Sequence, residues 1–227
     1  MWVATAAQPQ CGSSASLHGT CLVSRSKSSK RWLNEHHKDD FVRKSRLESY
    51  RSRAVYKLAE IDQRDSLITP KISVVELGAA PGGWTQYVAE KLSAQGSLVA
   101  VDILAMDSVP GATILQGDFT EDETLDQIRT SLDGRVADLV LSDMAPNFSG
   151  QLAVDQPRAM YLAELALDMC NELLAPGGNF LVKTFQGAGF EAFLRDVRLT
   201  FDVVKSRKPE ASRPRSREVY ILAKSRK

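Results

Sequence analysis

Several short apolar runs in this sequence end on, or lead directly into, an acidic side chain. These acids are Asp102, Asp118 and Asp143, at the runs 97–102, 112–115 and 138–142. If the runs are parallel strands, their carboxyl ends meet at the edge of the sheet where doubly wound proteins bind ligands. We expect Asp102 to accept hydrogen bonds from a ribose, and Asp118 from an adenine amino group beside Phe119. Each acid could instead cap the helix that follows, but acids that end consecutive strands favour a ligand site.

Two lysines are candidates for chemistry at the same edge. Lys183 lies in the apolar run 179–184, where burial of an amine is costly unless it reaches a polar partner. The alternative is a strand-end lysine whose amine reaches solvent. Lys57 lies on a predicted helix over 52–64 and would by itself be an exposed surface lysine. Its proximity to Arg51 and Arg53, just before a predicted strand, makes it a candidate too.

A turn of small residues follows the first predicted strand. The stretch 74–84 reads VVELGAAPGGW, the order of strand, glycine-rich turn and helix. Its spacing matches neither the dinucleotide fingerprint nor the P-loop, and Glu76 would repel a phosphate. A carboxylate there could accept from an ammonium or a ribose hydroxyl, which suits S-adenosylmethionine, a cofactor without phosphate. The glycines could also serve turn geometry alone.

The elements that must position these residues alternate between strands and helices, which predicts an α/β, doubly wound, mostly parallel sheet. Helices are expected over 158–174 and 189–199 as well as after Trp84. The last two strands, at 201–205 and 218–223, are expected to form a closing hairpin. Between them, the basic stretch 206–217 (SRKPEASRPRSR) fits phosphate binding.

Charge is distributed unevenly along the 227 residues, although the formal net charge is only +1. Residues 1–60 carry 11 Lys and Arg against 5 Asp and Glu, residues 205–227 carry 9 against 2, and the middle carries 9 against 21. If the fold brings the basic ends to one face, that face would bind a polyanion; otherwise they are two solvated tails.

Cysteine, histidine and hydropathy exclude several kinds of site. The three cysteines form no C-x-x-C pair, which argues against a disulfide framework or a zinc site and fits a reducing compartment. All three histidines precede residue 38, which disfavours a histidine base or a histidine-rich metal site in the rest of the chain. No run approaches the 18 apolar residues of a membrane span. From these three observations together we expect neither a metal site nor a membrane-spanning segment.

The N-terminal residues differ in composition from the rest. Residues 1–30 are rich in Ala, Ser, Gly and Gln and end in a basic, serine-rich tract. We expect a flexible leader over 1–30 and one domain over 31–227. The leader weakly resembles an organelle transit peptide, so a mitochondrial location is the alternative to a cytoplasmic one.

With these residues assembled, the chain resembles the FtsJ/RlmE family of ribosomal RNA 2′-O-ribose methyltransferases. The resemblance covers roughly residues 24–227 and rests on a set of segments. They are KSSKRWL, YRSRAVYKL, LGAAPGGW, LQGDF, SDMAPNFSG, RAMYLAELAL, LAPGGNFLVK, FQG and SRPRSREVY.

The resemblance implies a Rossmann-like methyltransferase fold with a seven-stranded, mostly parallel sheet and S-adenosylmethionine as donor. It implies a substrate too: the 2′-hydroxyl of a uridine in the A-loop of 23S (large-subunit) rRNA, modified on the assembled large ribosomal subunit. It further implies two residue sets, catalytic and cofactor-binding. They are Lys57, Asp143, Lys183 and Glu218, and Gly82, Trp84, Asp102, Asp118 and Asp143.

Within this interpretation, Lys183 would hold and help deprotonate the ribose hydroxyl, with Asp143 fixing the amine and Glu218 steadying Lys57 or the ribose. Two alternatives stay open. The protein could be a ribosome-assembly factor that binds rRNA without essential catalysis, or a 2′-O-methyltransferase for tRNA or another RNA. A monomer is the default expectation.

Overall fold

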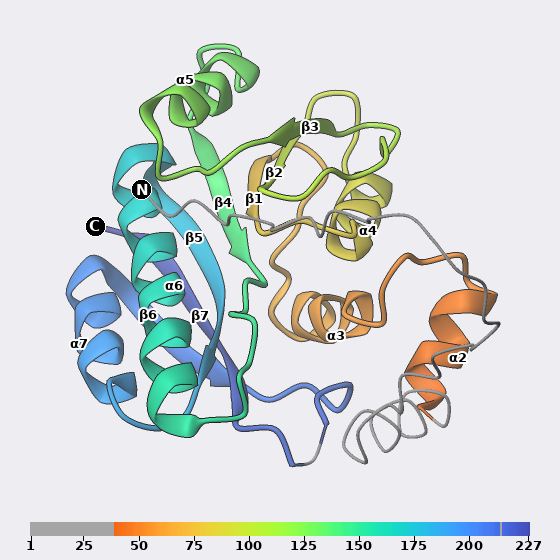
Figure 1. Cartoon of the computed structure of the whole chain (residues 1–227). Helices are drawn as coiled ribbons and strands as arrows, with labels where there is room; N and C mark the ends of the chain where they lie inside the picture. The colour runs from red at the N-terminus through yellow and green to blue at the C-terminus, as the bar shows by residue number, and fades with distance from the viewer. Residues whose placement is uncertain (1–38, 214) are drawn as a thin grey trace, which may run out of the picture. The chain divides into compact units, whose positions relative to one another are not determined.

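A seven-stranded sheet forms the centre of the computed structural model, which describes residues 39–213 and 215–227 (Figure 1). The strands run in the order β3-β2-β1-β4-β5-β7-β6. Strands β1 to β5 pair in parallel, and β7 pairs antiparallel with both β5 and β6. Their bounds are β1 Ser73–Leu77, β2 Ser97–Asp102, β3 Thr113–Gln116, β4 Ala137–Ser142, β5 Leu174–Phe185, β6 Phe201–Arg207 and β7 Glu218–Arg226. The predicted doubly wound sheet and its antiparallel C-terminal hairpin are confirmed.

Helices cover both faces of the sheet, because side chains that alternate along each strand are buried on opposite sides. The first face packs against α3 and α4, with Val74, Leu139 and Leu181 from the strands. The second face packs against α5, α6 and α7, with Val75, Val140 and Phe180. The helices are α2 Asp40–Leu47, α3 Val55–Asp65, α4 Gly83–Lys91, α5 Asp122–Ser131, α6 Leu152–Leu173 and α7 Phe190–Thr200.

The starts of α6 and β5 differ most from the predicted boundaries. Helix α6 begins six residues before the predicted start, and Pro157 lies inside it. The proline is the sixth residue of the helix, beyond the first turn, so the helix lacks the hydrogen bond that residue 157 would otherwise donate to the carbonyl four residues earlier. Strand β5 begins at Leu174, five residues before the predicted run 179–184, and so includes the Pro-Gly-Gly segment 176–178. A register shift between Ala137 and Leu139 of β4 accommodates those extra residues.

The beginning of the chain is described only from Asp39. Asp39 caps α2 by accepting from the Phe41 N–H, and its carboxylate also pairs with Arg53. Residues 38–227 form one compact unit, whereas the predicted leader 1–30 and the first residues of the predicted domain lie outside the described part. In the part that is described, no helix combines the length and apolar character needed to cross a membrane.

Candidate active site

The turn between β1 and α4 is shaped by its glycines. Gly78 has φ +74°, donates to the Val101 carbonyl at 2.9 Å, and lies so close to Met144 that a side chain would clash. Gly82 has φ +101° and is the N-cap of α4. These positions favour glycine because other residues rarely adopt such backbone angles. The turn therefore brings backbone and the start of α4 to the carboxyl end of β1.

A cavity of about 620 Å³ lies at this edge of the sheet; we call it the large cavity. Acidic side chains line it beside apolar ones. The acids are Glu76, Asp102, Asp118 and Asp143, and the apolar side chains include Ile103, Leu104, Phe119 and Trp84. Its volume lies within the range of small-ligand and cofactor sites. The mixture suits a ligand with hydroxyl or amino groups and a flat apolar ring.

Two of the lining acids also organise their own loops. The Asp102 carboxylate accepts from the Ala80 N–H at 2.9 Å and from the Leu104 N–H at 2.8 Å. Asp118 accepts from the backbone N–H and the hydroxyl of Thr120. Asp118 does not cap α5, whose N-cap is Glu121. Both carboxylates thus lie in the large cavity on backbone that they themselves hold in place.

Glu76 is the most deeply buried acid of the large cavity, with 1 % of its surface exposed. It accepts a hydrogen bond of 2.7 Å from the Thr85 hydroxyl. Burial, with smaller contributions from the nearby carboxylates of Asp143 and Asp102, raises the pKa of Glu76 to about 8, although the hydrogen bond from Thr85 opposes the shift. At neutral pH the group is therefore protonated without a ligand.

Four of the five residues predicted to bind the cofactor line the large cavity, and one does not. Asp102, Asp118, Asp143 and Trp84 all line the large cavity, and the Trp84 indole N–H also donates to the Ala54 carbonyl at 2.8 Å. Gly82 does not line it: a side chain there would meet Met106 and Arg51 instead. The neighbouring Gly83 lines the cavity and was not among the predicted contacts.

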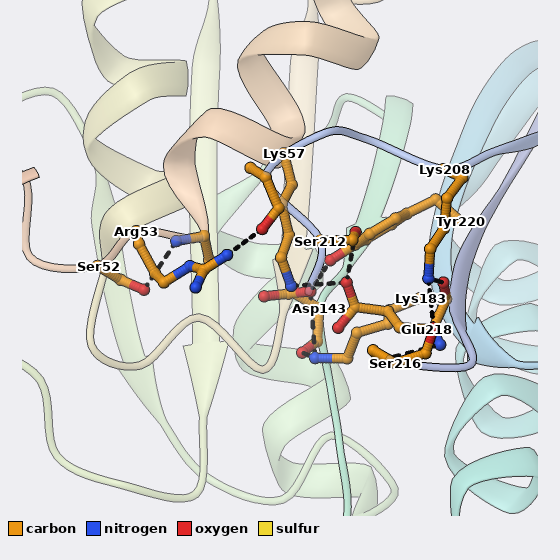
Figure 2. Close-up of polar contacts among 12 residues, drawn as sticks. Ser52, Arg53, Lys57, Asp143, Lys183, Lys208, Ser212, Ser216, Glu218 and Tyr220 are labelled. Carbon is orange, nitrogen blue, oxygen red and sulfur yellow. Dashed lines mark hydrogen bonds and ion pairs between the residues drawn. The ribbon is translucent and has the colours of Figure 1, made fainter. Parts of the chain in front are cut away.

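Two lysine–carboxylate pairs lie beside the large cavity (Figure 2). Lys183 Nζ is 3.1 Å from Asp143 Oδ1 and also donates to the Asp143 carbonyl. Lys57 Nζ is 2.7 Å from Glu218 Oε1. The four side chains are 8 to 18 % exposed, so both pairs are largely shielded from water. We call these four residues the lysine–carboxylate group; Asp143 and Lys183 also line the large cavity.

Four separate elements bring this group together. Lys57 comes from α3, Asp143 follows β4, Lys183 is in β5 and Glu218 begins β7. The antiparallel register places Lys183 opposite Tyr220. The Tyr220 hydroxyl donates to Asp143 Oδ1 at 2.7 Å, the same oxygen that Lys183 contacts.

Tyr220 is a member of this site that sequence reasoning missed. Burial and the adjacent Asp143 carboxylate raise its pKa well above its ordinary value, so the phenol stays protonated and keeps donating. The Lys57 ammonium lies 5.7 Å from the centre of its ring. A signal for Tyr220 was present, because two residues after Glu218 in a strand is the same face of the sheet.

The basic stretch 206–217 lies partly inward, against the lysine–carboxylate group. The Ser212 hydroxyl donates to Glu218 Oε1 at 3.0 Å, and the Lys208 amine donates to the carbonyls of Glu218 and Ser216. Arg53 donates to the Ala211 carbonyl. Arg53 therefore contacts the loop 206–217, and the hydrogen bonds of Arg53 and Lys208 go to backbone carbonyls in and beside that loop.

Within residues 39–213 and 215–227, no cluster of three or more His, Cys, Asp or Glu side chains could hold an ion. The nitrogen atoms of the site belong to lysine ammonium groups, which have no lone pair for a metal while they are protonated.

Comparison with known proteins gives consistent matches. The model of the FtsJ-like methyltransferase family matches residues 50–226. "Ribosomal RNA large subunit methyltransferase E" of Chromohalobacter salexigens is 58% identical over 87% of this chain and 94% of that protein. The protein of the same name from Legionella pneumophila strain Corby is 56% identical over 89% of this chain and 98% of that one.

Solved structures resemble the fold. A crystal structure described as a putative ribosomal RNA methyltransferase from Plasmodium falciparum has a TM-score of 0.69 at 24% identity, over 78% of this chain and 98% of that one. Human methyltransferase-like protein 13, solved in complex with SAH, has a TM-score of 0.51 at 13% identity, over 76% and 78%. The family match, the close relatives and the sheet order agree, and the chain belongs to the FtsJ-like methyltransferase family.

Proposed function

We propose that this protein transfers a methyl group from S-adenosylmethionine to the 2′-hydroxyl of a uridine in the A-loop of 23S rRNA, on the assembled large ribosomal subunit. The observation that carries the proposal is the position of Asp143, which lines the large cavity and fixes the Lys183 amine beside it. A donor in the cavity and an amine at its wall are what a hydroxyl acceptor requires.

The large cavity fits the cofactor by its chemistry. When bound, S-adenosylmethionine supplies a methyl group on a sulfonium, which is already a good leaving group. Asp102 is suited to the ribose hydroxyls, and Asp118 with Phe119 to the adenine. Glu76 and the glycine turn are suited to the amino-acid end, since an approaching ammonium favours ionisation of a buried acid.

The lysine–carboxylate group is suited to the acceptor. Lys183 Nζ directs two hydrogen bonds to Asp143, which leaves its remaining position for the ribose hydroxyl. In its neutral form that amine takes the hydroxyl proton as the oxygen–methyl bond forms. Lys57, held by Glu218, supplies the cation of the group and is suited to stabilise the negative charge that develops on the reacting oxygen.

The relatives support the choice of substrate. Both named relatives are called large-subunit ribosomal RNA methyltransferases and align over nearly their whole length. Because they come from bacteria, we place the enzyme in the cytoplasm with the ribosomal subunits, and we take a monomer as its working state. The basic residues around the loop 206–217 are suited to the phosphates of the RNA.

The proposal is tested by transfer of labelled methyl from S-adenosylmethionine to purified large subunits that lack the modification. Modified subunits and tRNA serve as controls, and the labelled nucleotide is mapped. Label at one A-loop 2′-hydroxyl, in the deficient subunits alone, is the expected result. Label on tRNA would mean that tRNA is the substrate in place of 23S rRNA. Tight binding of cofactor and subunits without any label would favour an assembly factor.

A further inference from the structure

A second cavity lies next to the lysine–carboxylate group and takes no part in the mechanism above. This small cavity measures about 330 Å³, and its lining includes Phe148, Leu152, Phe185 and Arg217. Phe148 directly follows Asn147, and Phe185 lies two residues after Lys183 in β5; both Asn147 and Lys183 line the large cavity. The two cavities are therefore neighbours that share the loop after β4 and the end of β5.

The walls of the small cavity are fixed before any ligand arrives. The Asp155 carboxylate accepts from the Ser149 N–H and hydroxyl, both at 2.8 Å, and from the Gly150 N–H at 2.9 Å, which holds the loop carrying Phe148. The Gln156 amide donates to the Phe185 carbonyl at 3.0 Å and fixes the end of β5. A preformed pocket loses less entropy on binding.

The exposed surface of the small cavity is aromatic and apolar. Phe148 is 55 % exposed and Leu152 is 54 % exposed. The Phe148 ring lies 5.3 Å from that of Phe185, edge to face. A planar ligand that covered these side chains would bury apolar surface and gain ring contacts.

The lining of the small cavity includes one cation, Arg217, that could meet a phosphate. Its one acidic lining residue, Asp155, already accepts three hydrogen bonds from the loop. The Arg217 side chain is exposed, and among the described residues no carboxylate lies within ion-pair distance of it. Its carbonyl accepts from the N–H of Gln186, the residue that follows β5, so the backbone that carries this cation is held beside the end of that strand.

We propose that the small cavity binds the base of the nucleotide that is methylated, with Arg217 at the adjoining phosphate; this rests on the proposed function. Single-stranded RNA is recognised by unstacked bases that pack on aromatic side chains and by cations at the backbone. A cavity of this size holds one base rather than several, and its position beside Lys183 keeps that nucleotide's ribose at the reacting amine.

Kinetics with deficient large subunits give the first test. Phe148→Ala is expected to raise KM for subunits about 5- to 150-fold, the range that corresponds to loss of one base–aromatic contact. KM for S-adenosylmethionine should not change. Leu199→Ala is the matched control, because Leu199 is an exposed apolar residue on α7 outside both cavities. An unchanged KM for subunits in Phe148→Ala would overturn the proposal.

Photo-crosslinking gives a second test that does not depend on turnover. The full chain with Phe148→p-benzoylphenylalanine is irradiated on deficient subunits, and the crosslinked position is mapped by reverse transcription. A crosslink at the methylated nucleotide is expected. A crosslink to a ribosomal protein or to a distant nucleotide would refute the base site. If the proposed function itself fails, the wild-type chain transfers no label to these subunits, whereas failure of this inference alone leaves wild-type transfer intact.

Discussion

The large cavity and the lysine–carboxylate group differ in how far apart along the chain their residues lie. Much of the cavity wall is built within β1, β2 and the turns that follow them, where Asp102 bonds to Ala80 and Leu104. The lysine–carboxylate group draws Lys57 from α3 and Glu218 from β7, 161 positions later. The first depends on local turns, and the second on the register of the whole sheet.

This difference predicts separable functions. Changes in the cavity wall should each weaken cofactor affinity only in part, because the binding energy is divided among many contacts. Changes in the lysine–carboxylate group should lower the rate of methyl transfer steeply, because a single amine accepts the proton of the ribose hydroxyl. Asp143 belongs to both, since it lines the cavity and pairs with Lys183.

The largest effect is expected for Lys183→Met, which keeps much of the side-chain volume and removes the amine. We expect the single-turnover rate of methyl transfer to fall by about 10²- to 10⁴-fold, as for loss of a general base. Cofactor affinity, measured by calorimetry, should stay within a few fold. Substantial residual methylation would remove Lys183 from the central role.

A smaller effect is expected for Asp102→Ala. The change removes a carboxylate from the cavity wall and the acceptor for two backbone N–H groups. The dissociation constant for S-adenosylmethionine should rise about 10-fold or more, since hydrogen bonds to a charged group are the strong ones. The transfer rate at saturating cofactor should change little. An unchanged affinity would mean that Asp102 only stabilises its loops.

A decrease of a few fold in the rate of methyl transfer is expected for Ser212→Ala. Ser212 and Lys57 share Glu218 Oε1, so removing the hydroxyl loosens the carboxylate without breaking the ion pair. We expect the transfer rate to fall about fivefold, which corresponds to one ordinary hydrogen bond. Cofactor affinity should be unaffected, and Ser212→Thr should restore the rate. A loss of affinity instead would mean that the loop reaches the large cavity.

The last prediction concerns folding stability and its pH dependence at Glu76, and not the rate of methyl transfer. Its pKa is raised from 4.5 to about 8 in the folded protein, so between these values the folded state binds more protons than the unfolded state. The contribution of Glu76 to the free energy of unfolding therefore falls as pH rises from about 5 to 8. Glu76→Gln, which can still accept from Thr85, should remove this dependence in urea unfolding experiments. Identical pH profiles for the two proteins would contradict the assignment.

The sequence predicted the local parts of the site better than the assembled ones. Strand β2 has the predicted bounds, and Asp102 at its end lines the large cavity, because one apolar run and one turn decide both. Lys183 could be suspected from its place in a strand. Its partner could not be derived from periodicity, because the contact depends on which strands pair and in what register.

Other features depended on tertiary contacts and were missed or misplaced. Gly82 stays a predicted cofactor contact; a side chain added to it would meet Met106 and Arg51, and it is the neighbouring Gly83 that lines the large cavity. Tyr220 and Ser212 reach the lysine–carboxylate group only after the hairpin and its loop fold back. Helix α6 begins at Leu152, six residues before the predicted start, and it continues through Pro157, where the backbone has no N–H to donate.

The most direct test measures cofactor affinity and single-turnover transfer to deficient large subunits on the same preparations of Lys183→Met and Asp102→Ala. Lys183→Met should lose transfer and keep affinity, and Asp102→Ala should lose affinity and keep transfer at saturating cofactor. If both variants lost both properties to the same extent, the separation between the large cavity and the lysine–carboxylate group would be wrong.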